Sequence, residues 1–209
     1  MTRAALGRTY AGQAIADRQK ERRARFLESA LTIFAQDGYS NSSVGAICRA
    51  AGLSSRQFYE EFSGREDLLV ELFLNIESDS IAAVSDAVIR ASDQGIEKII
   101  QASTRAYIQS VTSDPRRARV GLVEIVGASP RVEQVRLEQR KEWARMLREI
   151  ARHAAESGQI PAGDYDIRIS AVIGAINYVV YDWSISDPKP ALETVIDVLS
   201  RSLIGAMAS

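Results

Sequence analysis

Four polar side chains between Ser55 and Tyr59 have the types and the spacing to contact DNA. Phe58 and Phe62 are four residues apart, so on a helix they share one side and turn inward. The side chains left facing outward are Ser55, Arg56, Gln57 and Tyr59. Arginine and glutamine form bidentate hydrogen bonds with guanine and adenine edges, and serine and tyrosine hydroxyls suit phosphates. The pattern predicts a short helix that contacts bases.

The segment before this helix has the spacing of a helix-turn-helix. Ser42 is expected to cap a short helix over residues 43–51, and Gly52 ends that helix in the left-handed conformation without a Cβ penalty. Residues 54–57, Ser-Ser-Arg-Gln, match a capping box that opens the next helix. Cys48, four residues before the glycine, is expected to serve as small packing, and a redox sensor is the alternative. The sequence therefore predicts two short helices joined by a tight turn.

The N-terminal third of the chain is basic. Residues 1–65 hold ten Lys and Arg against six Asp and Glu, a balance of +4, whereas the whole chain carries −1. This asymmetry favours a polyanionic partner at one end, and a solvated charged helix face is the alternative.

Residues 1–16 are expected to form a flexible basic arm before a first helix over about residues 17–37. The arm and the helix start contain Arg3, Arg8, Arg18, Lys20, Arg22, Arg23 and Arg25. We interpret the cluster as a minor-groove or backbone contact that orders on DNA, with Arg22 and Arg23 among the contacts. A solvated tail is the alternative.

These features together resemble the DNA-binding domain of tetracycline-repressor-type (TetR-family) regulators. The resemblance covers about residues 20–70 and is carried by Gly38-Tyr39, Ser42-Ser43-Val44, the run from Ile47 to Ser54, the run from Phe58 to Phe62, and the run from Arg65 to Leu69. It implies a homodimeric, wholly helical regulator whose recognition helices enter the major grooves of a palindromic operator. It also implies that a small molecule bound in the larger domain releases the DNA, so that a repressor is expected.

By this resemblance, Ser43, Tyr59 and Arg65 fall where family members contact phosphates, and the residues from Ser55 to Gln57 fall where they approach bases. The complete set of predicted DNA contacts is Ser43, Ser54, Ser55, Arg56, Gln57, Tyr59, Arg65, Arg22 and Arg23. Three places depart from the family pattern, namely Gly45, Cys48 and the pair Glu60 and Glu61. Carboxylates repel phosphates, so the glutamates either point away or accept from cytosine N4.

The whole chain is expected to be all-α. A three-helix helix-turn-helix domain over residues 17–63 is followed by a larger helical domain for effector binding and dimerisation over residues 64–209. In the larger domain we expect helices over about residues 64–90, 95–113, 115–128, 130–157 and 164–186, and a last helix that begins at Pro190.

Two C-terminal helices are expected to form the homodimer interface, because the one that begins at Asp164 is apolar nearly all round. The predicted interface residues are Ile169, Ile173, Gly174, Ile176, Val180, Val195, Leu199 and Leu203. The alternative is that these helices close the core of the monomer.

Effector-site candidates are aromatic residues and isolated polar groups in apolar helices. They are Phe73, Tyr107, Glu124, Trp143, Asn177 and Tyr178. Each aromatic residue could instead be plain core, and Glu124 is expected to pair with Arg105 or Arg119.

Several functional classes find no support in the sequence. A single cysteine and a single histidine leave no intrachain disulfide and no two-histidine metal site, and no metal or cofactor is expected. No segment reads as a signal peptide or a membrane span, so a cytoplasmic protein is expected. No nucleophile–base pair supports an enzyme. A helical small-molecule-binding protein or enzyme that retains the helix-turn-helix as a scaffold is the alternative.

Overall fold

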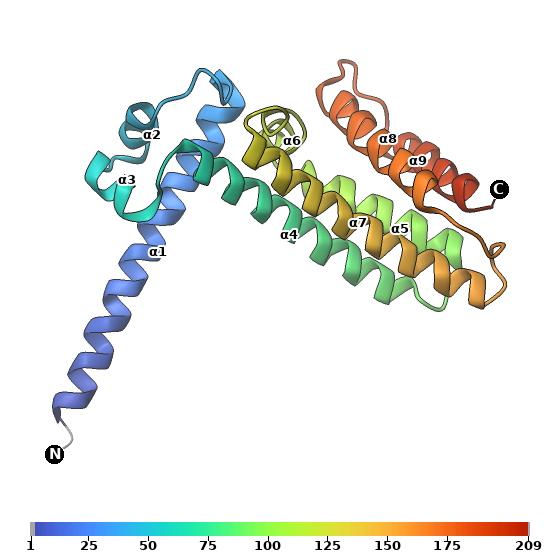
Figure 1. The fold of residues 1–209 in the computed structure, drawn as a ribbon, viewed down its shortest axis with the longest axis horizontal. Coiled ribbons are helices and arrows are strands. Elements are labelled where there is room, and N and C mark those ends of the chain that lie inside the picture. Colours follow the sequence, from blue (N-terminus) through green and yellow to red (C-terminus); the bar gives the residue numbers. More distant parts are fainter. Residues whose placement is uncertain (1–2, 209) are drawn as a thin grey trace. The chain divides into compact units, whose positions relative to one another are not determined.

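The computed structural model describes the backbone of residues 3–208 and the side chains of residues 16–207. Within those residues all regular structure is helical, which confirms the predicted fold class (Figure 1). The chain divides into two compact units, Met1–Leu72 and Phe73–Ser209. The division falls inside α4 (Arg65–Ala91), later than the predicted boundary at residue 64, because Arg65 and Glu71 bond to groups of the first unit.

The first unit contains α1 (Arg3–Asp37), α2 (Val44–Ala51), α3 (Ser55–Glu61) and the start of α4. Helix α1 begins earlier than the predicted start near residue 17, since no proline interrupts the segment that precedes it. The arm residues Arg3 and Arg8 lie outside the residues whose side chains the structure describes.

An aromatic cluster holds the first unit together. Phe26 of α1 packs edge-on against Phe58 at 5.3 Å and against Phe62 at 6.2 Å between ring centroids, and all three rings are buried. The inward side predicted for α3 is therefore confirmed. Cys48 is also buried, consistent with its predicted packing role, and Gly52 has φ 61°, the left-handed conformation expected of it.

The cap of α2 differs by one residue from the prediction. Ser43, not Ser42, is the N-cap, because its Oγ accepts a hydrogen bond from the amide of Ala46 at 3.1 Å. Ser42 is buried instead, and its Oγ donates to the carbonyl of Tyr39 at 2.7 Å.

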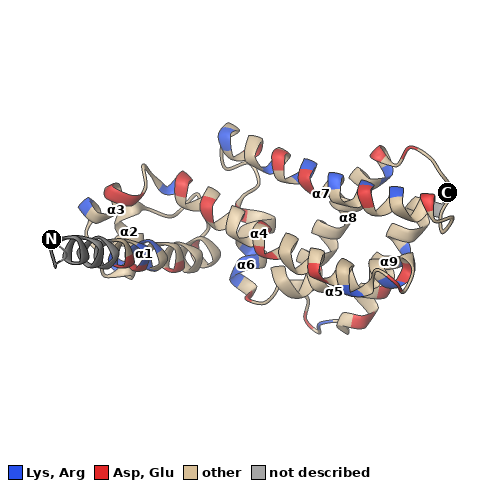
Figure 2. Cartoon of the chain, turned by 90° about the horizontal axis from the view of Figure 1, so that it is seen from below, with Lys and Arg blue, Asp and Glu red and all other residues tan. Residues whose placement is uncertain are grey.

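The second unit contains the rest of α4 and α5 (Ile96–Val111), α6 (Pro115–Arg119), a π-helical turn η1 (Val120–Glu124), α7 (Pro130–Glu156), α8 (Asp166–Ile185) and α9 (Leu192–Ala208). The single helix predicted over residues 115–128 is wrong in its second half, where the π-helical turn follows α6. Gly121 lies in this turn against Ile76, whose side chain would be 3.4 Å from an added Cβ. Charges of both signs follow α7 (Figure 2), as its sequence predicts for a helix with a water-facing side.

Side chains of α5, α7, α8 and α9 fill the core of the second unit. One cluster is centred on Ile100, Ile169 and Met207, and another on Ile108, Val180 and Leu199. Among the described residues, no helix is both long enough and apolar enough to cross a membrane.

The predicted dimer residues are mostly part of this core, which corrects their assignment. The buried ones are Ile169, Ile173, Val180, Val195, Leu199 and Leu203. Ile176 is partly buried and packs on both clusters, and only Gly174 is exposed. Residues of α8 that face the core were assigned to the dimer interface because this helix has two apolar faces, one directed inward and one directed outward.

Candidate DNA-binding surface and ligand cavity

The outward face of α3 carries three of the predicted DNA contacts, and all three are exposed. The Arg56 side chain is 90% exposed, and Tyr59 is 61% exposed although its ring stands edge-on to Phe58 at 5.3 Å. Ser55 is exposed beside them. An exposed guanidinium and an exposed phenol on a helix held from behind by aromatic packing are suited to a guanine edge and to a phosphate.

Gln57 has a different role from the one predicted. The side-chain Oε1 of Gln57 accepts hydrogen bonds from the backbone N–H of Ser54 at 2.9 Å and from the Ser54 Oγ at 3.0 Å. The backbone N–H of Gln57 in turn donates to the Ser54 Oγ at 3.2 Å. The predicted capping box is therefore confirmed. A bidentate adenine contact needs the same Oε1 as an acceptor, so Gln57 could contact adenine in that way only by breaking the cap.

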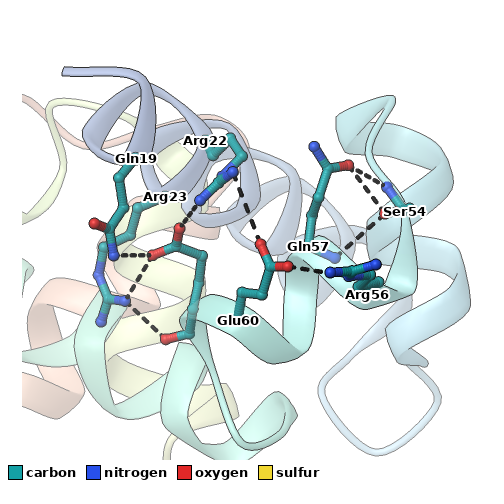
Figure 3. A network of polar contacts seen from close by, with 8 residues as sticks. Gln19, Arg22, Arg23, Ser54, Arg56, Gln57 and Glu60 are labelled. Carbon is teal, nitrogen blue, oxygen red and sulfur yellow. Dashed lines mark hydrogen bonds and ion pairs between the residues drawn. The ribbon is translucent and has the colours of Figure 1, made fainter. Parts of the chain in front are cut away.

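Arg22 and Arg23 are paired inside the first unit, contrary to their prediction as exposed DNA contacts. Arg22 Nη2 donates to Glu61 at 2.8 Å (Figure 3). Arg23 Nε donates to Glu71 at 2.9 Å. The hydrogen bond to Glu71 is the largest cause that raises the pKa of Arg23, and the negative charges of Glu71 and Glu61 raise this pKa further. The charges of Arg22 and Arg23 are thus paired with acidic residues of α3 and α4.

Two further arginines stabilise the turns around α2. Arg65 Nη1 donates to the carbonyls of Tyr39, at 2.9 Å, and of Ser42, and its guanidinium lies 5.1 Å from the Tyr39 ring centroid. Arg25 Nη2 donates to the carbonyl of Ala51 at 2.6 Å, so it caps the C-terminal end of α2. Arg65, predicted as a phosphate contact, is therefore engaged in holding the loop before α2.

A narrow cavity in the second unit gathers three of the predicted effector residues. Tyr107 donates to Asn177 Oδ1 at 2.7 Å, and its ring stands edge-on to Trp143 at 5.4 Å. All three residues lie in the walls of two cavities, one of about 60 Å³ and one of about 100 Å³, which we name the inner and the outer cavity. Burial raises the pKa of the Tyr107 hydroxyl.

The two cavities differ in their chemistry. The inner one is mostly apolar, with Val84, Leu147 and Leu203 in its wall. Ser103 also lines it, is 7% exposed, and has an Oγ with no hydrogen-bond partner among the described residues. The outer cavity is lined by polar and charged residues as well as by Phe73. An apolar wall with one unpaired hydroxyl is suited to a largely apolar ligand that carries a hydrogen-bonding group.

Among the wall residues that sequence reasoning missed is a buried carboxylate. Glu77 of α4 is 7% exposed and lines the outer cavity, and its Oε2 accepts a hydrogen bond from Trp143 Nε1 at 2.5 Å. Burial raises the pKa of this carboxyl, and the hydrogen bond from Trp143 opposes the rise. The available signal was its position one residue after Ile76 and four after Phe73, which places a carboxylate on an inward helix face.

Two other predicted effector residues lie elsewhere. Glu124 forms an ion pair with Arg119 at 2.7 Å, which is one of the two partners expected for it. Glu124 does not line either of the two cavities described above. Tyr178 is 70% exposed and does not line the cavity, which corrects its assignment.

Tyr178 belongs instead to an exposed apolar face of α8. Residues on this face recur at spacings of three and four, as expected for one side of a helix. They are Ile167, Ala171, Gly174, Ala175, Tyr178 and Ile185. Ile167 is 86% exposed and Ile185 60% exposed, and with their neighbours they form an apolar patch on one side of the helix.

Within the described residues, no group of three or more His, Cys, Asp or Glu side chains could hold a metal ion.

Comparison with known proteins finds similarity to one family of regulators. The sequence model described as bacterial regulatory proteins of the tetR family matches residues 26–72. The fatty acid metabolism regulator protein of Bacillus subtilis is 25% identical over 195 residues, which cover 91% of this chain and 97% of the relative. The transcriptional regulator AcrR of Shigella flexneri is 25% identical over 170 residues, which cover 78% of this chain and 79% of the relative.

Solved structures share the fold. The fatty acid degradation regulator FadR of Bacillus halodurans superimposes with a TM-score of 0.76 at 20% identity, over 88% of this chain and 95% of that one. FadR of Bacillus subtilis, solved in complex with stearoyl-CoA, superimposes with a TM-score of 0.72 at 20% identity, over 88% of this chain and 97% of that one.

Proposed function

We propose that this chain, a member of the TetR family of transcriptional regulators, is a ligand-responsive repressor. The relatives described above are regulators and not enzymes. It binds a palindromic operator as a homodimer, and a small, largely apolar effector releases it. Such a repressor acts in the cytoplasm, where its DNA lies.

The observation that carries DNA binding is the exposed face of α3. Arg56 and Tyr59 point outward from a short helix that is capped at its start by Ser54 and packed from behind by Phe58. Ser43, exposed at the start of α2, adds a hydroxyl for a phosphate. In this proposal Ser43 and Tyr59 hold the backbone, and Ser55 and Arg56 contact bases.

The exposed apolar face of α8 supports homodimerisation. A face that includes Ile167, Tyr178 and Ile185 exposes apolar area that a second copy would remove from water. Gly174, with nothing within 4 Å of an added Cβ, leaves room for a helix from a partner to approach closely. A palindrome with half-sites one DNA turn apart, roughly 34 Å, requires two copies of α3, which a two-fold dimer supplies.

The cavity around Tyr107 and Trp143 is the proposed effector site. An inner volume of about 60 Å³ is smaller than an acyl chain needs, so a ligand must separate the wall residues to enter. That requirement links binding to a helix displacement, which an effector can drive only through a higher affinity for the displaced state. The complex of a structural relative with stearoyl-CoA makes long-chain acyl thioesters the first class to examine.

The experiment is DNA binding by fluorescence anisotropy with fragments that flank the gene for this chain. Binding that saturates, resists unrelated competitor DNA and weakens steeply with salt is expected. Addition of a long-chain acyl thioester should then release the DNA. Binding removed equally well by unrelated DNA would contradict sequence-specific regulation at this locus, and a random-library selection would then decide whether any sequence is preferred.

A further inference from the structure

The carboxylate of Glu61, the last residue of α3, is buried against α1. Its side chain is only 1% exposed. One oxygen accepts a hydrogen bond from Arg22 Nη2 at 2.8 Å, and the other accepts from Gln19 Nε2 at 3.3 Å and lies 3.7 Å from Arg23 Nη1. A carboxylate buried to this degree requires such partners, because an unpaired charge away from water is strongly unfavourable.

Arg23 reinforces the same junction through the main chain. Its Nη1 donates to the carbonyl oxygen of Glu61 at 2.8 Å, at the C-terminal end of α3. Its guanidinium lies 4.2 Å from the centroid of the Phe62 ring, and its other side bonds to Glu71. A cation at a helix C-terminus complements the helix dipole, so Arg23 acts as a cap of α3.

Arg22 is directed toward α3 rather than toward solvent. Its Nε is buried and makes no hydrogen bond among the described residues, its Nη2 bonds to Glu61, and its Nη1 lies 3.8 Å from Glu60. Glu60 in turn accepts from the Nε of Arg56 at 3.3 Å (Figure 3). A continuous polar network therefore runs from α1 to the outward arginine of α3.

We propose that Glu61 is a positioning residue for DNA recognition, which fixes the angle of α3 on α1 through Arg22 and Arg23 and withdraws both arginines from phosphate contacts. This inference rests on the proposed function, in which α3 contacts bases. A helix of seven residues cannot hold its own conformation in water and depends on tertiary contacts. Base contacts are sensitive to its angle, because bidentate hydrogen bonds require fixed geometry, whereas phosphate contacts tolerate small rotations.

The test compares two duplexes, one selected from a random library by the wild-type chain and one with the same bases in scrambled order. Glu61→Gln keeps the shape of the side chain and removes its charge. We expect affinity for the selected duplex to fall about tenfold or more, and affinity for the scrambled duplex to change by less than about threefold. The salt dependence should steepen by up to about 0.9 in log–log slope, because released Arg22 becomes available to a phosphate.

Glu21→Gln is the matched control, since Glu21 lies exposed on α1 and its substitution changes the net charge of the unit equally. It should leave the ratio of the two affinities unchanged. Equal losses on both duplexes with Glu61→Gln, or the same ratio change with Glu21→Gln, would overturn the proposed role of Glu61.

Arg22→Ala supplies a second test that holds if Glu61→Gln fails to fold, because Arg23 and Gln19 still partner Glu61. We expect a lower affinity ratio with an unchanged salt slope. A slope shallower by about 0.9 with uniform loss on both duplexes would show that Arg22 contacts phosphate, and would overturn the inference. A wild-type chain that selects no sequence would instead overturn the proposed function itself.

Discussion

The indole N–H of Trp143 on α7 donates to the buried carboxylate of Glu77 on α4 at 2.5 Å. The same indole ring stands against Tyr107 of α5, and Tyr107 is bonded to Asn177 of α8. One cluster of four side chains thus joins four helices, and its members lie in the walls of the two cavities. A ligand that occupies both cavities must rearrange this cluster, so the cluster is where effector binding would be converted into helix displacement.

Burial of Glu77 predicts a specific pH dependence of stability. In the unfolded chain the Glu77 carboxyl titrates near pH 4.5, and burial raises its pKa in the folded protein. The folded protein therefore keeps the carboxyl proton of Glu77 to a higher pH than the unfolded chain does. The contribution of Glu77 to the free energy of unfolding therefore falls as pH rises above about 4.5. Glu77→Gln should therefore gain thermal stability relative to the wild type as the pH rises above about 4.5. Exposed Glu97→Gln is the control, and parallel pH profiles of the unfolding midpoint for all three proteins would contradict the prediction.

Arg56 and Tyr59 should differ in how their loss affects DNA binding. Arg56→Ala is expected to cost about 1–3 kcal/mol on the preferred duplex and to relax preference at one base position, because a bidentate guanine contact is removed. Tyr59→Phe removes a hydroxyl assigned to phosphate and should weaken binding similarly on all duplexes. Anisotropy titrations on single-base variants of the operator measure both effects. A uniform loss with Arg56→Ala would exclude that residue as a base contact.

Gly174→Arg should separate dimerisation from folding. Nothing lies within 4 Å of a Cβ added at Gly174, so the protomer has space for the side chain, and replacement of a helical glycine favours the helix by about 0.5–1 kcal/mol. A partner helix against this face would have no such space. Sedimentation should show a monomer where the wild type is a dimer. Gly64→Arg, which also has open space around its Cβ, should leave the dimer intact, and an undisturbed dimer with Gly174→Arg would place the interface elsewhere.

Ser103 and Ser200 form a matched pair for the effector site. Each has a buried Oγ without a partner among the described residues, but only Ser103 lines the inner cavity. Replacement of either by alanine should leave the free energy of unfolding unchanged or raise it by up to about 1–3 kcal/mol, because an unsatisfied hydroxyl is removed. Only Ser103→Ala should weaken the release of DNA by an acyl thioester, by about 0.5–1.5 kcal/mol. An equal effect of both variants on release would exclude Ser103 as a ligand contact.

The sequence determined the features that depend on near neighbours. The capping box of Ser54 and Gln57, the left-handed Gly52 and the inward pair Phe58 and Phe62 each involve residues at most four positions apart, so local geometry is sufficient to predict them. All-helical architecture follows from the same local patterns. Their order along the chain also carried the resemblance to the TetR family, since these positions match in sequence.

Only the tertiary structure decided which charges are neutralised and which apolar residues face outward. Arg22 and Glu61 are 39 residues apart, and nothing local to either residue encodes their pairing. The same is true of Glu77 and Trp143, 66 residues apart, whose contact defines the cavity. Helix α8 is apolar on two sides, and its periodicity cannot distinguish the side that packs on α9 from the side that carries Tyr178. Such choices are made by the packing of whole helices, because burial is a property of the assembled core and not of a segment.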